Sequence, residues 1–430
     1  MAKNKDIIPL HKNIPEEHVD IFPESVNLEE LVMDEESLKG YIFPRKFHSD
    51  PSVQKDQIEN LKKVIIHNGY LPDEVRAQLK KTGADFLEYT PEKTSKSHFY
   101  DGDRKILHVT NPRGIIRLQR DIDLVTLLTP LLGRTVPYRV YHWGDDNKVG
   151  DEFSANERAR DFAKNRALNA FLYLKENKFN LQGKINIVFG PHESLDTSQA
   201  DRVVCESKHD YLNYKILEMS DNIAVCYDYV YADQARMILH QVFNVCSSYF
   251  KGHNVNVFHY GKVGSLKSFL KKYMVFVPNS SCEYDSFDFR NEPNGTREEI
   301  KKNELQNCLS SANLASAIFR QEMGEFMEGT TLNATSTIRQ KKIVLERARN
   351  NNTLAIDMEF RSLAAVGLPA KTIYKDIRST KNFFAGVISD APSEGENLGN
   401  THYDRTMERK MATAYLKIIR TEVCETCHLM

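Results

Sequence analysis

The sequence has no excess of charge of either sign and no long apolar run. Its 58 Lys and Arg residues balance 59 Asp and Glu residues, so no net field steers the protein toward nucleic acid or an anionic membrane. No apolar run approaches the roughly 18 residues of a membrane-spanning helix, and none follows the first lysines as in a secretory signal. We therefore expect a soluble, cytoplasmic protein that binds no nucleic acid and has no transmembrane segment.

Cysteine is also scarce and unpatterned. The seven cysteines are odd in number and lie mostly inside apolar segments, which indicates reduced, packed thiols rather than a disulfide framework. His209, His240 and His259 stand at spacings that match no zinc signature, so we interpret them as packed or surface residues. The sequence thus predicts no metal site and no cofactor.

The length of 430 residues predicts two or three domains. Residues 1–50 are rich in Pro, Glu and Lys, which is typical of an extended or weakly ordered arm. Mainly helical patterns follow over residues 51–180. We expect an α/β domain over residues 181–422 and a short C-terminal tail over 423–430.

The α/β domain is predicted from short apolar strands that alternate with amphipathic helices. We expect strands over 185–190, 222–230, 255–261, 273–278, 325–332, 353–357 and 383–389. We expect helices over 232–250, 302–321, 337–350 and 405–420. The polar segment 285–299 is predicted to be a surface loop of the kind that often forms a lid.

Three stretches of this domain carry residues suited to chemistry. In FHYGKVGSLK, residues 258–267, a strand is expected to enter a turn at Gly261 and Gly264 before a helix, where backbone N–H groups and Lys262 could hold an anion. A plain tight turn is the alternative. In LAIDMEFRSLAAVG, residues 354–367, Asp357 can cap a helix with Glu359 in its first turn, or the pair can face a substrate.

The third stretch is FFAGVISDAP, residues 383–392. Its strand delivers Ser389 and Asp390 just before Pro392. An Asp at the carboxyl end of a central strand lies where open α/β sheets bind ligands. A turn or capping role is the alternative.

The order of these motifs resembles the nucleoside phosphorylase superfamily, and the AMP nucleosidases most closely. GKVGSLK, GTTL, AIDMEF and VISDAP follow one another over residues 258–392, and the resemblance covers about residues 220–420. It implies a three-layer α/β sandwich with a central mixed sheet. It also implies an enzyme that cleaves the N-glycosidic bond of a purine nucleoside or nucleotide, and a homo-oligomer.

The resemblance assigns roles to residues. Asp390 would be the acid that protonates the departing base, with its pKa raised well above the ordinary ~3.9 by burial. Glu359 would accept hydrogen bonds from the ribose 2′ and 3′ hydroxyls while Met358 packs against the sugar, and Asp357 would cap the helix. Phe360 and Ser389 would also lie on the substrate side.

The phosphate or nucleophile side departs from the family pattern. The resemblance places Gly261, Lys262, Gly264 and Arg339 there, but Arg339 is displaced along its helix. DYVYADQAR, with Tyr229, Tyr231 and Asp233, replaces a Gly- and Ser-bearing segment. We therefore prefer water to phosphate as the nucleophile. A phosphate-dependent phosphorylase and an inactive nucleotide-binding sensor or effector are the alternatives.

The sequence ends in CETCHLM. Cys427 begins a four-residue pattern that fits prenylation, and Cys424 could carry a second acyl chain. Chance agreement is the alternative, because the pattern is short. One lipid chain would give only weak membrane association.

Overall fold

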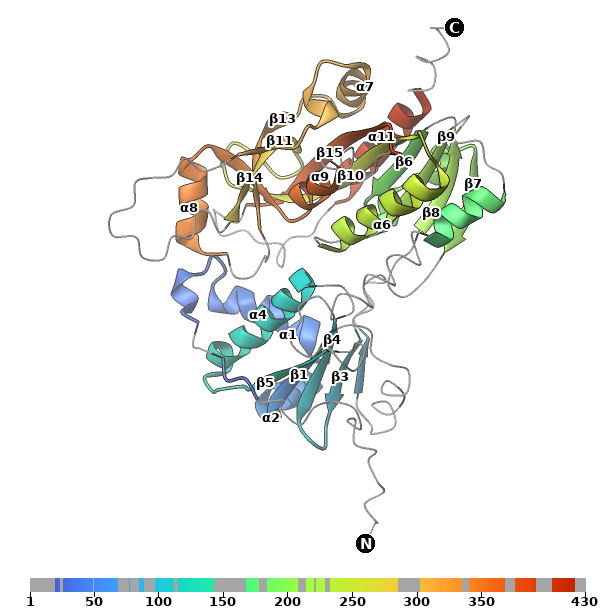
Figure 1. Ribbon diagram of the computed structural model, residues 1–430. Coiled ribbons are helices and arrows are strands. Elements are labelled where there is room, and N and C mark those ends of the chain that lie inside the picture. The colour runs from blue at the N-terminus through green and yellow to red at the C-terminus, as the bar shows by residue number, and fades with distance from the viewer. Residues whose placement is uncertain are drawn as a thin grey trace, which may run out of the picture. The chain divides into compact units, whose positions relative to one another are not determined.

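The computed structural model forms two compact units, Met1–Glu29 with Asp34–Phe162, and Glu30–Met33 with Ala163–Met430 (Figure 1). The structure describes residues 20–23, 26–48, 50–68, 77, 85–88, 97–111, 115–142, 168–177, 184–207, 214–219, 222–228, 233–284, 302–334, 340–367, 376–391 and 404–421. The predicted loop 285–299, Arg339, Tyr229, Tyr231 and the C-terminal tail with Cys424 and Cys427 lie outside these residues.

The first unit is a mixed α/β structure, not the mainly helical region that we expected over residues 51–180. Its sheet has the strand order β2-β3-β4-β1-β5, in which β1 is parallel to β4 and β5 while β3 is antiparallel to β2 and β4. The strands are β1 (Lys63–Asn68), β2 (Asp85–Glu88), β3 (Ser97–Asp101), β4 (Ile106–Asn111) and β5 (Tyr138–His142). The helices are α1 (Glu35–Lys46), α2 (Pro51–Asn60) and α4 (Ile115–Leu132).

The sequence pattern explains why helix gives way to strand after α2. Asp50 caps α2 by accepting from the backbone N–H of Ser52 at 2.8 Å, and Pro51 occupies the first turn, where its missing N–H costs nothing. After Asn60 the β-branched run of β1 begins, and its Val64 and Ile66 are fully buried. Burial of every second residue is the period of a strand, so this segment forms β1 rather than the helix predicted from its sequence.

The second unit is built on a ten-stranded mixed sheet. Nine strands follow the order β12-β11-β13-β14-β10-β6-β9-β8-β7, and the tenth, β15, pairs with β10 and β11. The strands are β6 (Lys184–Phe189), β7 (Arg202–Ser207), β8 (Tyr214–Met219), β9 (Asn222–Tyr227), β10 (Asn254–Ser265), β11 (Val275–Glu283), β12 (Asn303–Glu304), β13 (Met327–Asn333), β14 (Thr353–Asp357) and β15 (Ser379–Asp390). All seven predicted strands are confirmed, while β7, β8 and β12 were not predicted.

Five of these strands close into a ring. β10 pairs with β15, β15 with β11, β11 with β13, β13 with β14, and β14 returns to β10. β10 also pairs with β6, so it connects this ring to the open part of the sheet formed by β6, β9, β8 and β7. Strand ends from distant parts of the sequence are therefore held beside the end of β10.

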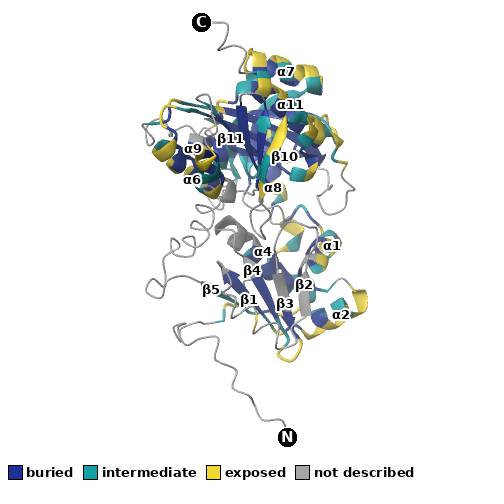
Figure 2. Cartoon of the chain, turned by 90° about the vertical axis from the view of Figure 1, so that its right-hand side faces the viewer, coloured by how far each residue is buried: buried dark blue, intermediate teal, exposed yellow. Residues whose placement is uncertain are grey.

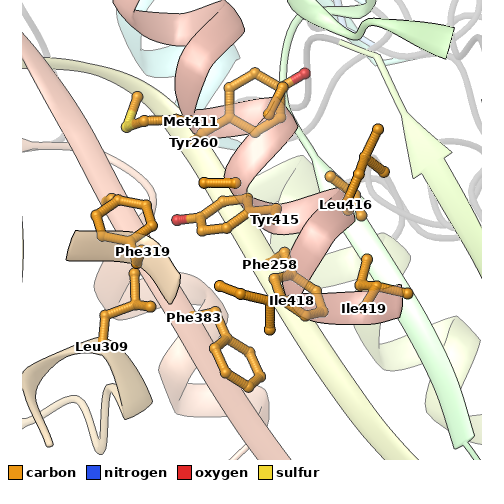
Figure 3. Packing of buried hydrophobic residues seen from close by; sticks show 14 of the residues in the cluster. Phe258, Tyr260, Leu309, Phe319, Phe383, Met411, Tyr415, Leu416, Ile418 and Ile419 are labelled. Atoms are coloured by element: carbon orange, nitrogen blue, oxygen red, sulfur yellow. The ribbon is translucent and has the colours of Figure 1, made fainter. Parts of the chain in front are cut away.

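Helices cover both faces of the sheet, which gives three layers. They are α6 (Asp233–Tyr249), α7 (Leu314–Met323), α8 (Lys342–Asn350), α9 (Phe360–Gly367) and α11 (Thr406–Thr421). The ring of Phe383 stacks on that of Phe258, with 4.4 Å between their centroids. The Phe258 ring also contacts the ring of Tyr415 on α11, with 5.3 Å between centroids (Figure 3). The next residue, Phe384, stacks instead on Phe360 of α9 at 5.8 Å. Consecutive strand residues thus face different helical layers.

The core follows from this layering. The central strands β6, β9, β10 and β15 are buried along most of their length. Figure 2 shows strands of this sheet in dark blue, the colour of buried residues. The predicted helix over 302–321 is shorter than expected, because β12 and the 3-10 turn Cys308–Ser310 precede α7. The expected helices over 232–250 and 405–420 correspond closely to α6 and α11.

Three further observations concern the described residues alone. None of their helices is both long enough and apolar enough to cross a membrane. They contain no group of three or more His, Cys, Asp or Glu side chains that could hold a metal ion. Their five cysteines are all free thiols.

Candidate active site

The glycines of GKVGSLK lie in a strand, not in the predicted turn before a helix. β10 continues through Gly261 and Gly264 to Ser265, and neither glycine has a positive φ. Close packing of β10 against β15 is instead seen at a glycine of the partner strand. A Cβ on Gly386 of β15, the partner of Gly261, would already lie 2.6 Å from Cγ1 of Val263. The predicted turn and helix N-terminus, on which an anion site in this segment would have depended, are therefore not formed at these glycines.

Gly264 brings two other motifs together. It pairs with Ile356 of β14 on one side and with Asp390 of β15 on the other. Neighbouring strands lie about 4.8 Å apart, so Ile356 and Asp390 are separated by roughly 10 Å across β10. This separation suits a ligand the size of a nucleoside, held between AIDMEF and VISDAP.

The GTTL strand joins the same corner. Asn333, at the end of β13, pairs with Asp357 at the end of β14. The backbone N–H of Ala334 donates to the carbonyl of Asp357 at 2.8 Å. All four motifs singled out in the sequence therefore meet around the end of β10.

Asp390 is buried and held by its neighbour. Its side chain is 4% exposed, and the hydroxyl of Ser389 lies 2.6 Å from Oδ1 of Asp390 and 3.3 Å from the carbonyl of Val263. The register between β10 and β15 shifts after Val263, so Ser389 lies between the two residues of β15 that pair with Val263 and Gly264. Ser389 is itself 1% exposed, so its side chain orients the acid from inside the protein.

Asp357 caps α9, as its capping interpretation predicted. Its Oδ1 accepts from the backbone N–H groups of Glu359 at 3.0 Å and Phe360 at 2.9 Å. Burial raises the pKa of Asp357 to about 6, although the N–H groups of Phe360 and Glu359 stabilise the carboxylate; the Glu283 charge adds to the rise. The cap fixes the position of the two residues that follow it.

Those residues are Met358 and Glu359, which are half-buried at the start of α9. Phe360, which we predicted to lie on the substrate side, packs in the core beside the site. It is 1% exposed, stacks on Phe384 and meets the ring of His259 edge-on at 5.4 Å. Its ring supports the site from within the core.

An ion pair that ties α9 to β11 was not predicted from the sequence. Arg361 Nη2 pairs with Oε1 of Glu283 at 2.6 Å, and the other carboxylate oxygen of Glu283 accepts from Asn333 at 3.1 Å. Glu283 ends β11 and lies beside Asn333 of β13. No sequence pattern pairs residues so far apart, because only the parallel register of β11, β13 and β14 aligns them.

Lys262 of β10 lies near two carboxylates. Its side chain reaches solvent, but partial burial lowers its pKa while the carboxylates of Glu408 and Asp390 oppose that shift. Glu408, on α11, is 1% exposed and accepts from the hydroxyl of Ser194 at 3.2 Å. A glutamate on the buried face of an amphipathic helix is the signal that could have identified it.

His259 was interpreted as a packed residue, and it is 6% exposed. Burial lowers its pKa to about 3, so the imidazole is neutral at pH 7. Nδ1 has no hydrogen-bond partner among the described residues. Its packing interpretation is confirmed, but an apolar environment alone does not explain a buried nitrogen without a partner.

No protein-family model matches the chain, and no curated protein sequence matches it. Among solved structures it is similar to a futalosine hydrolase mutant of Helicobacter pylori, with 16% identity, a TM-score of 0.39, and coverage of 56% of this chain and 99% of the other. It is also similar to the 5′-methylthioadenosine/S-adenosylhomocysteine nucleosidase from Neisseria meningitidis, with 14% identity, a TM-score of 0.41, and coverage of 56% and 99%.

The corresponding nucleosidase from Helicobacter pylori is a third similar structure, with 18% identity, a TM-score of 0.39, and coverage of 56% of this chain and 98% of the other. Nucleosidases of this kind belong to the superfamily that the four motifs resemble. At such identities and TM-scores the similarity does not extend to substrate or activity, so function rests on the site itself.

Proposed function

We propose that the second unit hydrolyses the N-glycosidic bond of a purine nucleoside or nucleotide and releases the free base. The observation that carries the proposal is the pairing of Gly264 with both Ile356 and Asp390. It sets a buried carboxyl group at one edge of β10, and the Met358–Glu359 pair follows β14 at the other.

This arrangement supplies what glycoside cleavage needs. As the C1′–N9 bond breaks, the base gains negative charge and the sugar becomes an oxocarbenium-like cation. Asp390 donates a proton to the base, and the Ser389 hydroxyl, 2.6 Å from Oδ1, holds the carboxyl group in position. Glu359 accepts from the 2′ and 3′ hydroxyls, and its charge stabilises the cation.

Water is the nucleophile in this proposal. The predicted anion-binding turn at Gly261 and Gly264 is a strand instead, which removes the main feature that favoured a phosphate site. We keep the finer expectations as part of the proposal: an adenine nucleotide such as AMP as substrate, and a cytoplasmic homo-oligomer. Weak membrane association would follow if Cys427 is prenylated.

The test is chromatography of the products formed from purine nucleosides and nucleotides, with and without inorganic phosphate. Wild-type protein should release free base equally well without phosphate. Asp390→Asn should lower kcat at least 100-fold, since a general acid contributes about 10²–10⁴-fold. Glu359→Gln should lower kcat/KM by about tenfold or more, because it weakens the hold on the sugar.

Glu346→Gln is the matched control, because Glu346 is an exposed carboxylate on α8. It should retain wild-type rates. Strict dependence on phosphate would instead support a phosphorylase. Ligand binding without turnover of any purine substrate would support the inactive sensor and contradict the proposal.

A further inference from the structure

His259 presents one edge of its imidazole toward Gly261. A Cβ on Gly261 would lie 3.3 Å from Cε1 and 3.9 Å from Nε2 of His259. The lack of a side chain at Gly261 therefore leaves room for the Cε1–Nε2 edge on the stretch of β10 that leads to the candidate site. The opposite nitrogen, Nδ1, is buried without a partner in the described residues.

The imidazole lies near the sugar-binding end of the site and far from the acid. Phe360, which meets its ring at 5.4 Å, directly follows Glu359. Asp390 pairs with Gly264, five residues further along β10, which is roughly 17 Å at the rise of a strand. His259 and Asp390 thus lie at opposite ends of the strand segment that contains Gly261.

The chemistry of a nucleoside gives this placement a meaning. The base leaves from one face of the sugar, and the nucleophile must reach C1′ from the other, which is also the face of the 2′ and 3′ hydroxyls. A group beside the hydroxyl-binding Glu359, and remote from the acid Asp390, is therefore on the nucleophile side. We propose that His259 orients the attacking water and accepts its proton, an inference that rests on the proposed hydrolase function.

The step balances without another reactant. The C1′–N9 electron pair passes to the base, which takes the proton of Asp390. The water oxygen forms the C1′–O bond, and its proton passes to the unshared pair of His259 Nε2 and then to solvent, which reprotonates Asp390. One water is consumed, and free sugar and free base are formed.

A weakly basic imidazole is adequate for this role. Burial keeps His259 neutral, with a pKa of about 3, so one ring nitrogen always has an unshared pair. A water oxygen bonded to the anomeric carbon is strongly acidic and gives up its proton even to a weak base. The same neutral ring offers no charge to phosphate, in agreement with water as the nucleophile.

The test compares His259→Phe with wild-type protein on the best purine substrate. Phe fills the space and removes the buried unpaired nitrogen, so the melting temperature should not fall. We expect kcat to drop about 100-fold or more, with KM within threefold, because substrate contacts remain. His259→Asn, a smaller polar replacement, should show the same split between kcat and KM if His259→Phe fails to fold.

Tyr415→Phe is the control, since the Tyr415 hydroxyl donates to the backbone carbonyl of His259 at 3.0 Å and does not reach the ring. It should keep kcat within threefold. A His259 variant with kcat within threefold of wild type, or with its loss confined to KM, overturns the inference while the hydrolase function stands. Sugar 1-phosphate as the product in phosphate buffer also overturns it. A wild-type protein that releases no base contradicts both proposals.

Discussion

Gly264 and Asp390 face each other across β10 and β15 at the point where the register of the two strands shifts. The shift inserts Ser389, whose hydroxyl lies 2.6 Å from Oδ1 of Asp390. A local irregularity of the sheet thereby aims the acid and supplies its hydrogen-bond donor. β-bulges commonly re-aim side chains in this way.

Ser389→Ala should therefore lower activity without removing the acid. The loss of one hydrogen bond of about 1 kcal/mol predicts a fall in kcat of roughly five- to tenfold, measured as base release under saturating substrate. Ser316→Ala is the matched control, because the buried Ser316 hydroxyl donates to the Leu309 carbonyl at 3.0 Å on α7. An equal fall in both variants would contradict the prediction.

Asp357→Asn should change the pH dependence of stability. With a folded-state pKa of about 6 against 3.8 when unfolded, Asp357 binds its proton more tightly in the fold. Its contribution is fully present below pH ~4 and is lost as pH rises through 6, a change of about 3 kcal/mol.

Asn can still cap α9 but carries no charge. The difference in unfolding free energy between variant and wild type should therefore grow in favour of Asp357→Asn from pH 4 to pH 7 and then level off. Urea titrations followed by circular dichroism at several pH values measure this difference. A difference that is flat over that window would show that the Asp357 pKa is not raised.

Arg361→Met should loosen the segment that holds Met358 and Glu359. Removal of the 2.6 Å pair with Glu283 should raise KM about three- to tenfold and leave kcat within twofold, because the acid is untouched. Arg320→Met provides the comparison, since Arg320 pairs with Glu328 at 2.7 Å on the surface. If both variants behave alike in steady-state kinetics, the Arg361–Glu283 pair has no role in substrate binding.

Gly190→Ala should destabilise the second unit. A Cβ at this position would lie 2.3 Å from Cε1 of Tyr260, whose ring is 1% exposed and whose hydroxyl donates to the Pro191 carbonyl at 2.9 Å. Overpacking of this kind costs about 1–3 kcal/mol. Calorimetry should show a lower melting temperature for the transition of that unit.

Gly40→Ala is the counterpart in the first unit, because no atom lies within 4 Å of its Cβ position in α1. Alanine favours a helix interior by about 1 kcal/mol over glycine. It should raise the melting temperature of the first unit and leave that of the second unchanged. A shift of the second transition would contradict the independence of the two changes.

The sequence allowed the elements with a clear period to be predicted. Strand β14 was expected over 353–357 and has those bounds, because its apolar run ends in an N-cap signal. The glycines at 261 and 264 misled because glycine permits both turns and close strand contacts. Only the register distinguishes these, and register depends on residues far away in the chain.

The candidate site was predictable only in part for the same reason. Asp390 and Asp357 stand at strand ends that hydrophobic pattern alone locates. The contact of His259 with Phe360, and the pairing of Arg361 with Glu283, depend on which elements become neighbours. Strand β7 was missed because its apolar and polar residues alternate weakly and it is partly exposed, which resembles a loop in sequence.

The pairing of β10 with β15 joins residues 125 positions apart, as the hydrogen bond from Ser379 to Asn254 shows. A ribosome adds about 5–20 residues per second, so β10 waits roughly 6 to 25 s for this partner during synthesis. Its apolar residues stay exposed on that side for the whole interval, and the unpaired edge is a template for association with other chains. The strand that organises the chemistry is therefore also the one whose protection a cell must ensure while the chain is being made.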